Sequence, residues 1–305
     1  MKTPALIGID WGTSSFRASL IDAEGGTLES REEPSGILAI QNRDFEGFLK
    51  EAIGDWMCRF PDTPIIASGM ITSRNGWVET PYVSLPLGIN ELAAVLVKHR
   101  TQDGRTVHFI TGCSQDSNGD RPDVLRGEET ELIGYLTAHG IESGTFLLPG
   151  THNKWLRVED GKISHFVTHM TGEVFSLLGR HSILAFGEEP APFCEEAFRK
   201  GLIAVKKRPG SLLSNIFTTR TLLLFGHINK EASADYLSGI LIGEEFLSNL
   251  SVDGPPHSLT IIGRQDLSLR YQKAAEFFGI PSTIATPGLS QLGQLAIARS
   301  AGLTP

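Results

Sequence analysis

One local pattern occurs twice in the sequence, and it constrains the fold more than any other feature. In each half an apolar strand meets a Gly-Thr turn, and two more strands and an amphipathic helix follow. The turns are Gly12-Thr13 and Gly150-Thr151. Their separation is too long for a solenoid repeat. We therefore predict a duplicated α/β domain, with two βββαβαβα units facing each other across a cleft.

Hydrophobic periodicity places the elements of each half. The first half is predicted to form strands at 6–10, 16–21, 27–32, 65–68 and 107–111, and helices at 44–59, 90–99 and 128–139. The second half is predicted to form strands at 146–148, 154–158, 163–168, 259–262 and 282–285. Its helices are predicted from 171 onward and at 191–205, 212–225, 232–250, 267–278 and 289–301.

The helical segments between 191 and 250 interrupt the repeated unit and predict an insertion in the second domain. In the helix that begins near Thr171, we expect apolar side chains to point inward; they are Val174, Phe175, Leu177 and Leu178. Two glycines and a serine at 139–144 favour a domain boundary there. We predict domains at 1–140 and 141–305.

Composition limits the classes of function. The chain has 305 residues, 40% of them hydrophobic and 20% charged, which is typical of a globular protein. A net charge of −8 argues against a nucleic-acid partner, and the absence of a long apolar run argues against a membrane partner. The cluster Lys206-Lys207-Arg208 is interpreted as a solvated patch without a function.

The cysteines favour a reducing compartment. Cys58, Cys113 and Cys194 stand far apart and form no CxxC pair, so neither a zinc site nor a redox motif is expected. No apolar segment of signal-peptide length precedes Asp10. We predict a cytoplasmic location.

The chemistry is expected at the two turns. A glycine turn between antiparallel strands points backbone N–H groups outward and can bind an anion without lysine. Asp10, at the tip of the first strand, is suited to hold Mg²⁺ beside a polyphosphate. Either turn alone is also consistent with an ordinary hairpin. Neither a GxxxxGK[ST] loop nor a GxGxxG loop is present to bind a nucleotide instead.

These residues carry a resemblance. "IGIDWGTSSFRASLID" resembles the first phosphate motif of the actin, hexokinase and sugar kinase superfamily, whose halves are ribonuclease-H-like domains. Four later stretches, in order, are similar to the 2-dehydro-3-deoxygalactonokinase family across essentially the whole chain. They are "SRNGWVETPYVSLP", "DVLRGEETELIG", "LPGTHNKWLRV" and "THMTGEVFSLL".

The resemblance implies transfer of phosphate from ATP, with Mg²⁺, to the terminal hydroxyl of 2-dehydro-3-deoxy-D-galactonate, giving the 6-phosphate in galactonate catabolism. It also implies a set of nucleotide-binding residues and a connecting helix after Pro287-Gly288. The first phosphate turn would comprise Asp10, Gly12, Thr13 and Ser14, the second Gly150 and Thr151, and the adenosine segment Gly263 and Arg264.

One position departs from the family pattern. Many relatives begin the second phosphate turn with an acidic residue, where this chain has Pro149. Metal binding would then depend more on Asp10, and His152 and Lys154 would supply further donors to phosphate. A structural role for His152 and a solvated edge position for Lys154 stay open.

Phosphoryl transfer also needs a carboxylate that accepts the hydroxyl proton. The candidates are Asp123, Glu128 and Glu129, and the dipole at the start of the 128–139 helix favours an ionised base there. Acidic residues in a first helical turn are also common caps. The sequence does not choose among these three carboxylates.

A sugar acid calls for an arginine that grips its carboxylate. Arg74 and Arg126 are the candidates, since both follow first-half strands. Asn75, Trp77 and Tyr82 would frame the substrate, although core packing is equally consistent with the two aromatic residues.

Two alternatives remain at this stage. One is a kinase of another sugar or sugar acid on the same fold, and the other is a nucleotide-switched binding protein. The expected partner is a small-molecule sugar acid, and a homodimer stays open.

Overall fold

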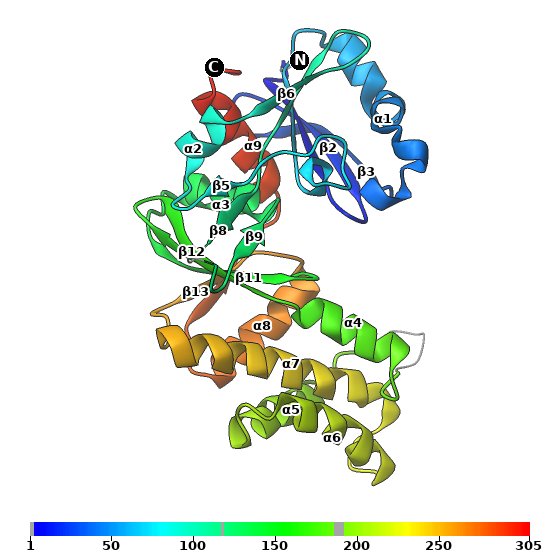
Figure 1. Ribbon diagram of the computed structural model, residues 1–305, viewed down its shortest axis with the longest axis vertical. Coiled ribbons are helices and arrows are strands. Elements are labelled where there is room, and N and C mark those ends of the chain that lie inside the picture. Colours follow the sequence, from blue (N-terminus) through cyan, green and yellow to red (C-terminus); the bar gives the residue numbers. More distant parts are fainter. Residues whose placement is uncertain (1–2, 117–118, 186–191) are drawn as a thin grey trace. The chain divides into compact units, whose positions relative to one another are not determined.

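The computed structural model describes residues 3–116, 119–185 and 192–305 (Figure 1). The chain divides into two compact units. Unit 1 comprises Met1–Ser143, Arg157–Phe166 and Thr286–Pro305, and unit 2 comprises Gly144–Leu156 and Val167–Ala285. The predicted domain limits at 140 and 141 stay a prediction.

Unit 1 is built on a six-stranded mixed sheet of order β3-β2-β1-β4-β7-β6. The central strand β1 pairs antiparallel with β2 and parallel with β4. Apart from Asp10, every residue of β1 is buried, as expected for a central strand covered on both faces. The strands are β1 (Leu6–Trp11), β2 (Phe16–Ile21), β3 (Thr27–Glu33), β4 (Ile65–Ser68), β6 (Val97–Arg100) and β7 (Thr106–Phe109).

An aromatic cluster joins this sheet to helix α1 (Phe45–Arg59). The ring of Trp11 lies 4.9 Å from Phe16 and 5.5 Å from Phe45. Asp44 caps the helix by accepting a hydrogen bond from the Gly47 N–H at 2.9 Å. The sequence prediction of this helix is confirmed.

The predicted helix at 90–99 is confirmed over 90–94 and is wrong beyond that point. Helix α2 (Ile89–Ala94) ends at the β-branched Val95, and the chain then forms edge strand β6. Side chains of β6 alternate between half-buried and exposed, a strand period, and β6 pairs antiparallel with β7.

Shorter elements of unit 1 were also not predicted. A three-stranded sheet contains β5 (Val83–Ser84), β8 (Cys113–Gln115) and β9 (Asp123–Leu125). Three 3₁₀ turns lie at η1 (Ile37–Ala39), η2 (Gln41–Arg43) and η3 (Met70–Thr72).

Helices α3 (Glu128–His139) and α9 (Leu289–Ser300) cross through glycines. A Cβ at Gly134 would overlap the Leu289 carbonyl oxygen, and one at Gly293 would overlap the Thr130 carbonyl oxygen. Beside this crossing, Gln294 Nε2 donates to the carbonyl of Ile9 at 2.8 Å. The last helix is thereby attached to the first strand.

Unit 2 contributes to a five-stranded sheet of order β12-β11-β10-β13-β14, in which β10, β13 and β14 are parallel. The strands are β10 (Gly144–Leu148), β11 (Asn153–Glu159), β12 (Lys162–His169), β13 (Leu259–Ile261) and β14 (Ser282–Ile284). The helices are α4 (Thr171–His181), α5 (Glu195–Lys207), α6 (Leu212–Leu224), α7 (Lys230–Asp253) and α8 (Gln265–Phe277).

The order of the second half follows the predicted repeat with added helices. In Figure 1, α5 and α6 lie beside the long helix α7. The start of the helix predicted at 191–205 lies outside the described residues, and α5 begins at Glu195. Leu177 of α4 was predicted to point inward, but its side chain is 50% exposed. Its neighbours Val174 and Leu178 take the face that packs on α7. Among the described helices, none is long and apolar enough to cross a membrane.

A Gly→Ala substitution inside a helix usually stabilises a protein, but at the α3–α9 crossing we expect it to destabilise the fold. Gly293→Ala is expected to lower the free energy of unfolding by about 2 kcal/mol, because the new methyl group would push α9 from α3. Gly54→Ala in α1 is the control, since a Cβ there meets nothing within 4 Å. It is expected to raise the free energy by about 0.5–1 kcal/mol. Urea unfolding measures both, and equal effects would contradict a tight crossing.

Candidate functional site

The turn after β1 is closed by its own backbone and open toward solvent. Gly12 N–H donates to the Ser15 carbonyl at 2.9 Å, and Thr13 and Ser14 are exposed. Behind the turn, Gly36 packs so closely on the backbone of Thr13 that no Cβ fits there. The turn is therefore a supported, exposed stretch of backbone, as an anion-binding turn requires.

Asp10 lies at the carboxyl end of β1, close to the start of α3. Its carboxylate is 27% exposed and pairs with Arg17 at 3.4 Å. Gly69 and Gly127, both with positive φ, allow this approach. A Cβ on Gly69 would lie 3.2 Å from Asp10 Oδ1, and one on Gly127 would lie 3.1 Å from the Gly69 Cα. Burial raises the pKa of Asp10, and Arg17 opposes that shift.

The first turn of α3 adds three carboxylates, one of which the sequence analysis missed. Burial, and then the charges of Asp10 and Glu128, raise the pKa of Glu131 to about 7. Ser290 Oγ of α9 donates to Glu131 at 3.3 Å. The available signal was spacing, because Glu131 stands three residues after Glu128 on the same helical face.

Glu128 and Glu129 differ in access. Glu129 is 1% exposed, and its oxygens accept hydrogen bonds from Gly127 N–H at 2.6 Å and from Thr130 Oγ1 at 3.0 Å. Burial, and then the charge of Glu128, raise the pKa of Glu129 to about 8. Glu128 is half-buried and accepts from the Arg126 N–H at 3.1 Å. Asp123, the third candidate, accepts from the Val124 N–H at 2.8 Å on β9.

Arg126 holds the two ends of one loop together. Its Nη1 donates to the carbonyl and the hydroxyl of Thr72, both at 2.6 Å, and to Thr80 Oγ1 at 2.7 Å. Its Nη2 donates to the Thr80 carbonyl at 3.1 Å, and its guanidinium lies 4.3 Å from the Tyr82 ring centroid. Both terminal nitrogens are therefore engaged with protein atoms.

The loop between Thr72 and Thr80 carries the other predicted substrate residues. Arg74 and Asn75 are exposed, and Arg43 donates to the carbonyls of Asn75 at 3.3 Å and Gly76 at 2.6 Å. Trp77 instead packs edge-on against Phe109 at 5.6 Å beside the core. The structure thus leaves Arg74 and Asn75 accessible and places Trp77 in packing.

The turn after β10 rests on a buried polar network that the sequence analysis missed. Gly150 N–H donates to Asn153 Oδ1 at 2.7 Å, and Asn153 Nδ2 donates to Glu245 Oε2 at 2.7 Å. Trp155 and Tyr271 also donate to Glu245, at 2.7 and 2.9 Å. No local pattern signals this network, because its members come from distant elements.

The remaining predicted residues of unit 2 surround this turn. Gly172 of α4 packs on the Gly150 carbonyl, as Gly36 does on the other turn. His152 Nε2 lies 2.5 Å from Glu173 Oε2. A Cβ on Gly263 would lie 3.2 Å from the Pro149 carbonyl oxygen, so the end of β13 adjoins this turn. Arg264 pairs with Asp266 at 2.8 Å and is exposed.

Lys154 is not a solvated edge residue. Its side chain is 6% exposed, and its Nζ donates to Thr168 Oγ1 at 2.6 Å. This position on β11 is therefore structural at least in part.

The protein oxygens near Asp10 would coordinate a hard cation only if a bound phosphate and water supplied the other ligands. Across residues 3–116, 119–185 and 192–305, no group of three or more His, Cys, Asp or Glu is arranged to hold a metal. Mg²⁺ commonly binds one or two carboxylates and completes its shell with water and phosphate oxygens. Asp10, an oxygen donor beside an exposed turn, fits that mode.

Comparisons with known proteins identify the family of this chain. The model of a family described as 2-keto-3-deoxy-galactonokinase matches residues 10–297. The 2-dehydro-3-deoxygalactonokinase of Escherichia coli K12 is 33% identical over 98% of this chain and 99% of that protein. A crystal structure from Sinorhizobium meliloti, provisionally named for the same activity, is 29% identical and covers 97% of this chain and 98% of that chain, with a TM-score of 0.87.

A more distant structure shows the fold alone. The activator of 2-hydroxyisocaproyl-CoA dehydratase from Clostridium difficile, solved with ADPNP, is 12% identical with a TM-score of 0.52. It covers 97% of this chain and 96% of that chain. The α/β fold is that of actin-like ATPases and sugar kinases, and the fold prediction is confirmed.

The buried Glu129 predicts a pH-dependent stability difference. Its pKa is about 8 in the folded chain and about 4.5 when exposed, so between these values folding retains a proton. Raising the pH from 5 to 8 should therefore destabilise the wild type relative to Glu129→Gln by on the order of 1 kcal/mol per pH unit. Urea unfolding across that range measures the difference. The exposed Glu79→Gln is the control and should follow the wild type. Parallel pH profiles for Glu129→Gln and the wild type would contradict a buried, protonated Glu129.

Proposed function

The chain belongs to the 2-keto-3-deoxy-galactonokinase family, and from this premise we propose how its turns and carboxylates carry out the reaction. It is a sugar-acid kinase that phosphorylates 2-dehydro-3-deoxygalactonate. The observation that carries this conclusion is the family match over residues 10–297, nearly the full chain. Neither a kinase of another sugar nor a nucleotide-switched binding protein is favoured.

The nucleotide is proposed to be ATP, held by the backbone of the two turns. Thr13 and Ser14 are exposed beside Asp10, whereas the Gly12 N–H is already donated to the Ser15 carbonyl. Asp10 would hold Mg²⁺ on the phosphates, and the ion would neutralise charge on the transferring group. The raised pKa of Asp10 marks a carboxylate whose charge is poorly solvated, which a bound cation would stabilise.

Unit 2 is proposed to contribute the second turn and the adenosine segment. Thr151 and His152 are exposed, whereas the Gly150 N–H is already donated to Asn153. Phosphate contacts from this turn would therefore come from Thr151 and His152. Gly263 adjoins the turn, and the exposed Arg264 follows it, so both lie where a nucleotide bound at Thr151 could reach them.

Glu128 is proposed as the group that accepts the substrate proton. The terminal hydroxyl oxygen forms a bond to the γ-phosphorus while the bond to the β,γ-bridging oxygen breaks and ADP leaves. The hydroxyl proton passes to a carboxylate. Glu128 is accessible, whereas Glu129 is 1% exposed and uses both oxygens on Gly127 and Thr130. Glu129 is better suited to shape the start of α3 than to meet substrate.

Arg74 and Asn75 are proposed to bind the sugar acid, and Arg126 to fix the loop that carries them. An exposed guanidinium can bind a carboxylate with two parallel N–H donors. The guanidinium of Arg126 instead donates its hydrogen bonds to Thr72 and Thr80. Arg126 would therefore affect substrate binding indirectly, by fixing the loop that carries Arg74 and Asn75.

We also propose a cytoplasmic location, consistent with three cysteines that carry no disulfide. A homodimer stays a prediction.

The activity is tested by measuring ADP release with 2-dehydro-3-deoxygalactonate, other 2-keto-3-deoxy sugar acids and neutral sugars. We expect turnover with the named acid and formation of a phosphate ester at its terminal hydroxyl. Asp10→Asn should lower kcat about 100-fold or more while the thermal unfolding temperature is kept. A response to neutral sugars alone would contradict the substrate, and near wild-type turnover of Asp10→Asn would contradict only the metal role.

Two arginine variants separate binding from positioning. Arg74→Ala should raise KM for the sugar acid roughly tenfold or more without changing stability, because the side chain is exposed. Arg126→Ala should also raise KM, and in addition lower the free energy of unfolding by about 2 kcal/mol through lost hydrogen bonds. The exposed Arg121→Ala is the control. If Arg126→Ala raised KM at unchanged stability, Arg126 would be a direct ligand.

A further inference from the structure

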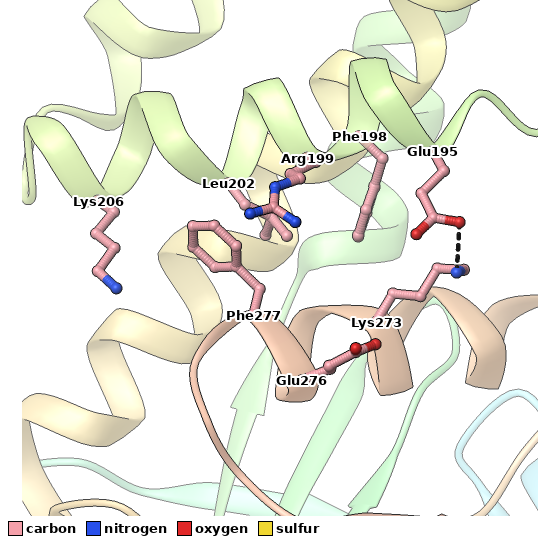
Figure 2. Close-up of a pocket in the computed structure, with 8 residues that line it drawn as sticks. All are labelled: Glu195, Phe198, Arg199, Leu202, Lys206, Lys273, Glu276 and Phe277. Carbon is pink, nitrogen blue, oxygen red and sulfur yellow. Dashed lines mark hydrogen bonds and ion pairs between the residues drawn. The ribbon is translucent and has the colours of Figure 1, made fainter.

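A pocket lies in unit 2 between α5 and α8. It has a volume of about 350 Å³, within the range of small-molecule sites. Figure 2 shows its lining side chains, which project from both helices toward the space between them. The lining residues are Glu195, Phe198, Arg199, Leu202, Lys206, Lys273, Glu276 and Phe277.

One end of this pocket carries two cations beside a single aromatic ring. The guanidinium of Arg199 lies 5.9 Å from the centroid of the Phe277 ring, and Lys206 Nζ lies 5.2 Å from it. Both come from α5, and Figure 2 shows Phe277 rising from α8 between them. Among the residues that the structure describes, neither cation has a carboxylate within ion-pair distance.

The other end of the pocket carries one cation, Lys273, and two carboxylates, Glu195 and Glu276. Lys273 Nζ lies 2.5 Å from Glu195 Oε2, so these two charges neutralise each other. Glu276 lies on α8 beneath Lys273 in Figure 2. The positive potential is therefore concentrated at Arg199 and Lys206, in a chain whose net charge is −8.

This pocket is separate from the second phosphate turn. Arg264 precedes the first turn of α8, where the adenosine segment is expected, whereas Lys273, Glu276 and Phe277 occupy its last turns. From Arg264 to Lys273 the helix rises about 13 Å. A nucleotide at Thr151 and Arg264 therefore does not account for Arg199 and Lys206.

The geometry points to a binding site for a small phosphate monoester at the Arg199–Lys206 end of the pocket. A phosphate monoester carries a charge of about −1.5 to −2 at neutral pH, which matches two unpaired cations. The guanidinium fork and the ammonium both suit phosphate oxygens. Phe277, with the buried Phe198 and Leu202, offers an apolar wall for the carbon body of the ligand.

The proposal is tested with phenyl phosphate as the probe, added to the isotope-labelled full chain. Amide chemical shifts from α5 and from residues 273–277 should move together and saturate. The double variant Arg199→Ala/Lys206→Ala should raise the Kd about tenfold or more. Lys200→Ala/Lys207→Ala removes the same charge from the same helix outside the pocket and should leave the Kd unchanged. Benzoate, with one charge on the same ring, should bind more weakly.

Several outcomes would overturn the proposal. They are shifts confined to residues 10–15 and 150–154, equal loss of binding in both double variants, and benzoate binding as tightly as phenyl phosphate. Kinase activity without the probe should be the same in both double variants and the wild type, so failure here leaves the proposed function untouched.

Discussion

The close crossing of α3 and α9 is the contact on which the site of unit 1 depends. Gly134 and Gly293 bring the two backbones together with no side chain between them. Gln294, one residue further, donates to the Ile9 carbonyl and to Ser68 Oγ at 2.8 and 2.9 Å. A helix near the end of the chain thereby fixes the start of α3 against the ends of β1 and β4. The carboxylates of α3 and Asp10 take their mutual positions from this contact.

That placement brings four carboxyl groups together, and keeping them charged carries an electrostatic cost. Burial and mutual repulsion raise the pKa of Glu131 to about 7 and of Glu129 to about 8. Only part of this cost is offset by the positive end of the α3 dipole and by Arg17 beside Asp10. Functional sites often hold ionisable groups in arrangements that are less stable than the fold would otherwise allow. The proposed Mg²⁺ at Asp10 supplies the missing positive charge.

Local sequence patterns were sufficient to predict much of the fold and the two Gly-Thr turns. The limits of α3 and of α1 follow from nearby residues, and both were predicted. The strand β6 was missed because its stability comes from pairing with β7, which a helical spacing of apolar residues does not reveal. The hydrogen bonds of Arg126 were missed for a similar reason, because Thr72 and Thr80 become its neighbours only in the folded chain.

The two turns share a backbone plan but differ in chemistry. Each is supported from behind by a glycine, Gly36 or Gly172. In unit 1 the preceding strand presents Asp10, whereas in unit 2 the corresponding stretch contains Pro149, and the Gly150 N–H is engaged by the network of Asn153 and Glu245. A turn held by a buried network is rigid and carries no acidic group of its own. The duplication therefore permits a division of roles, in which one copy provides the carboxylate for a cation and the other a fixed surface for phosphate.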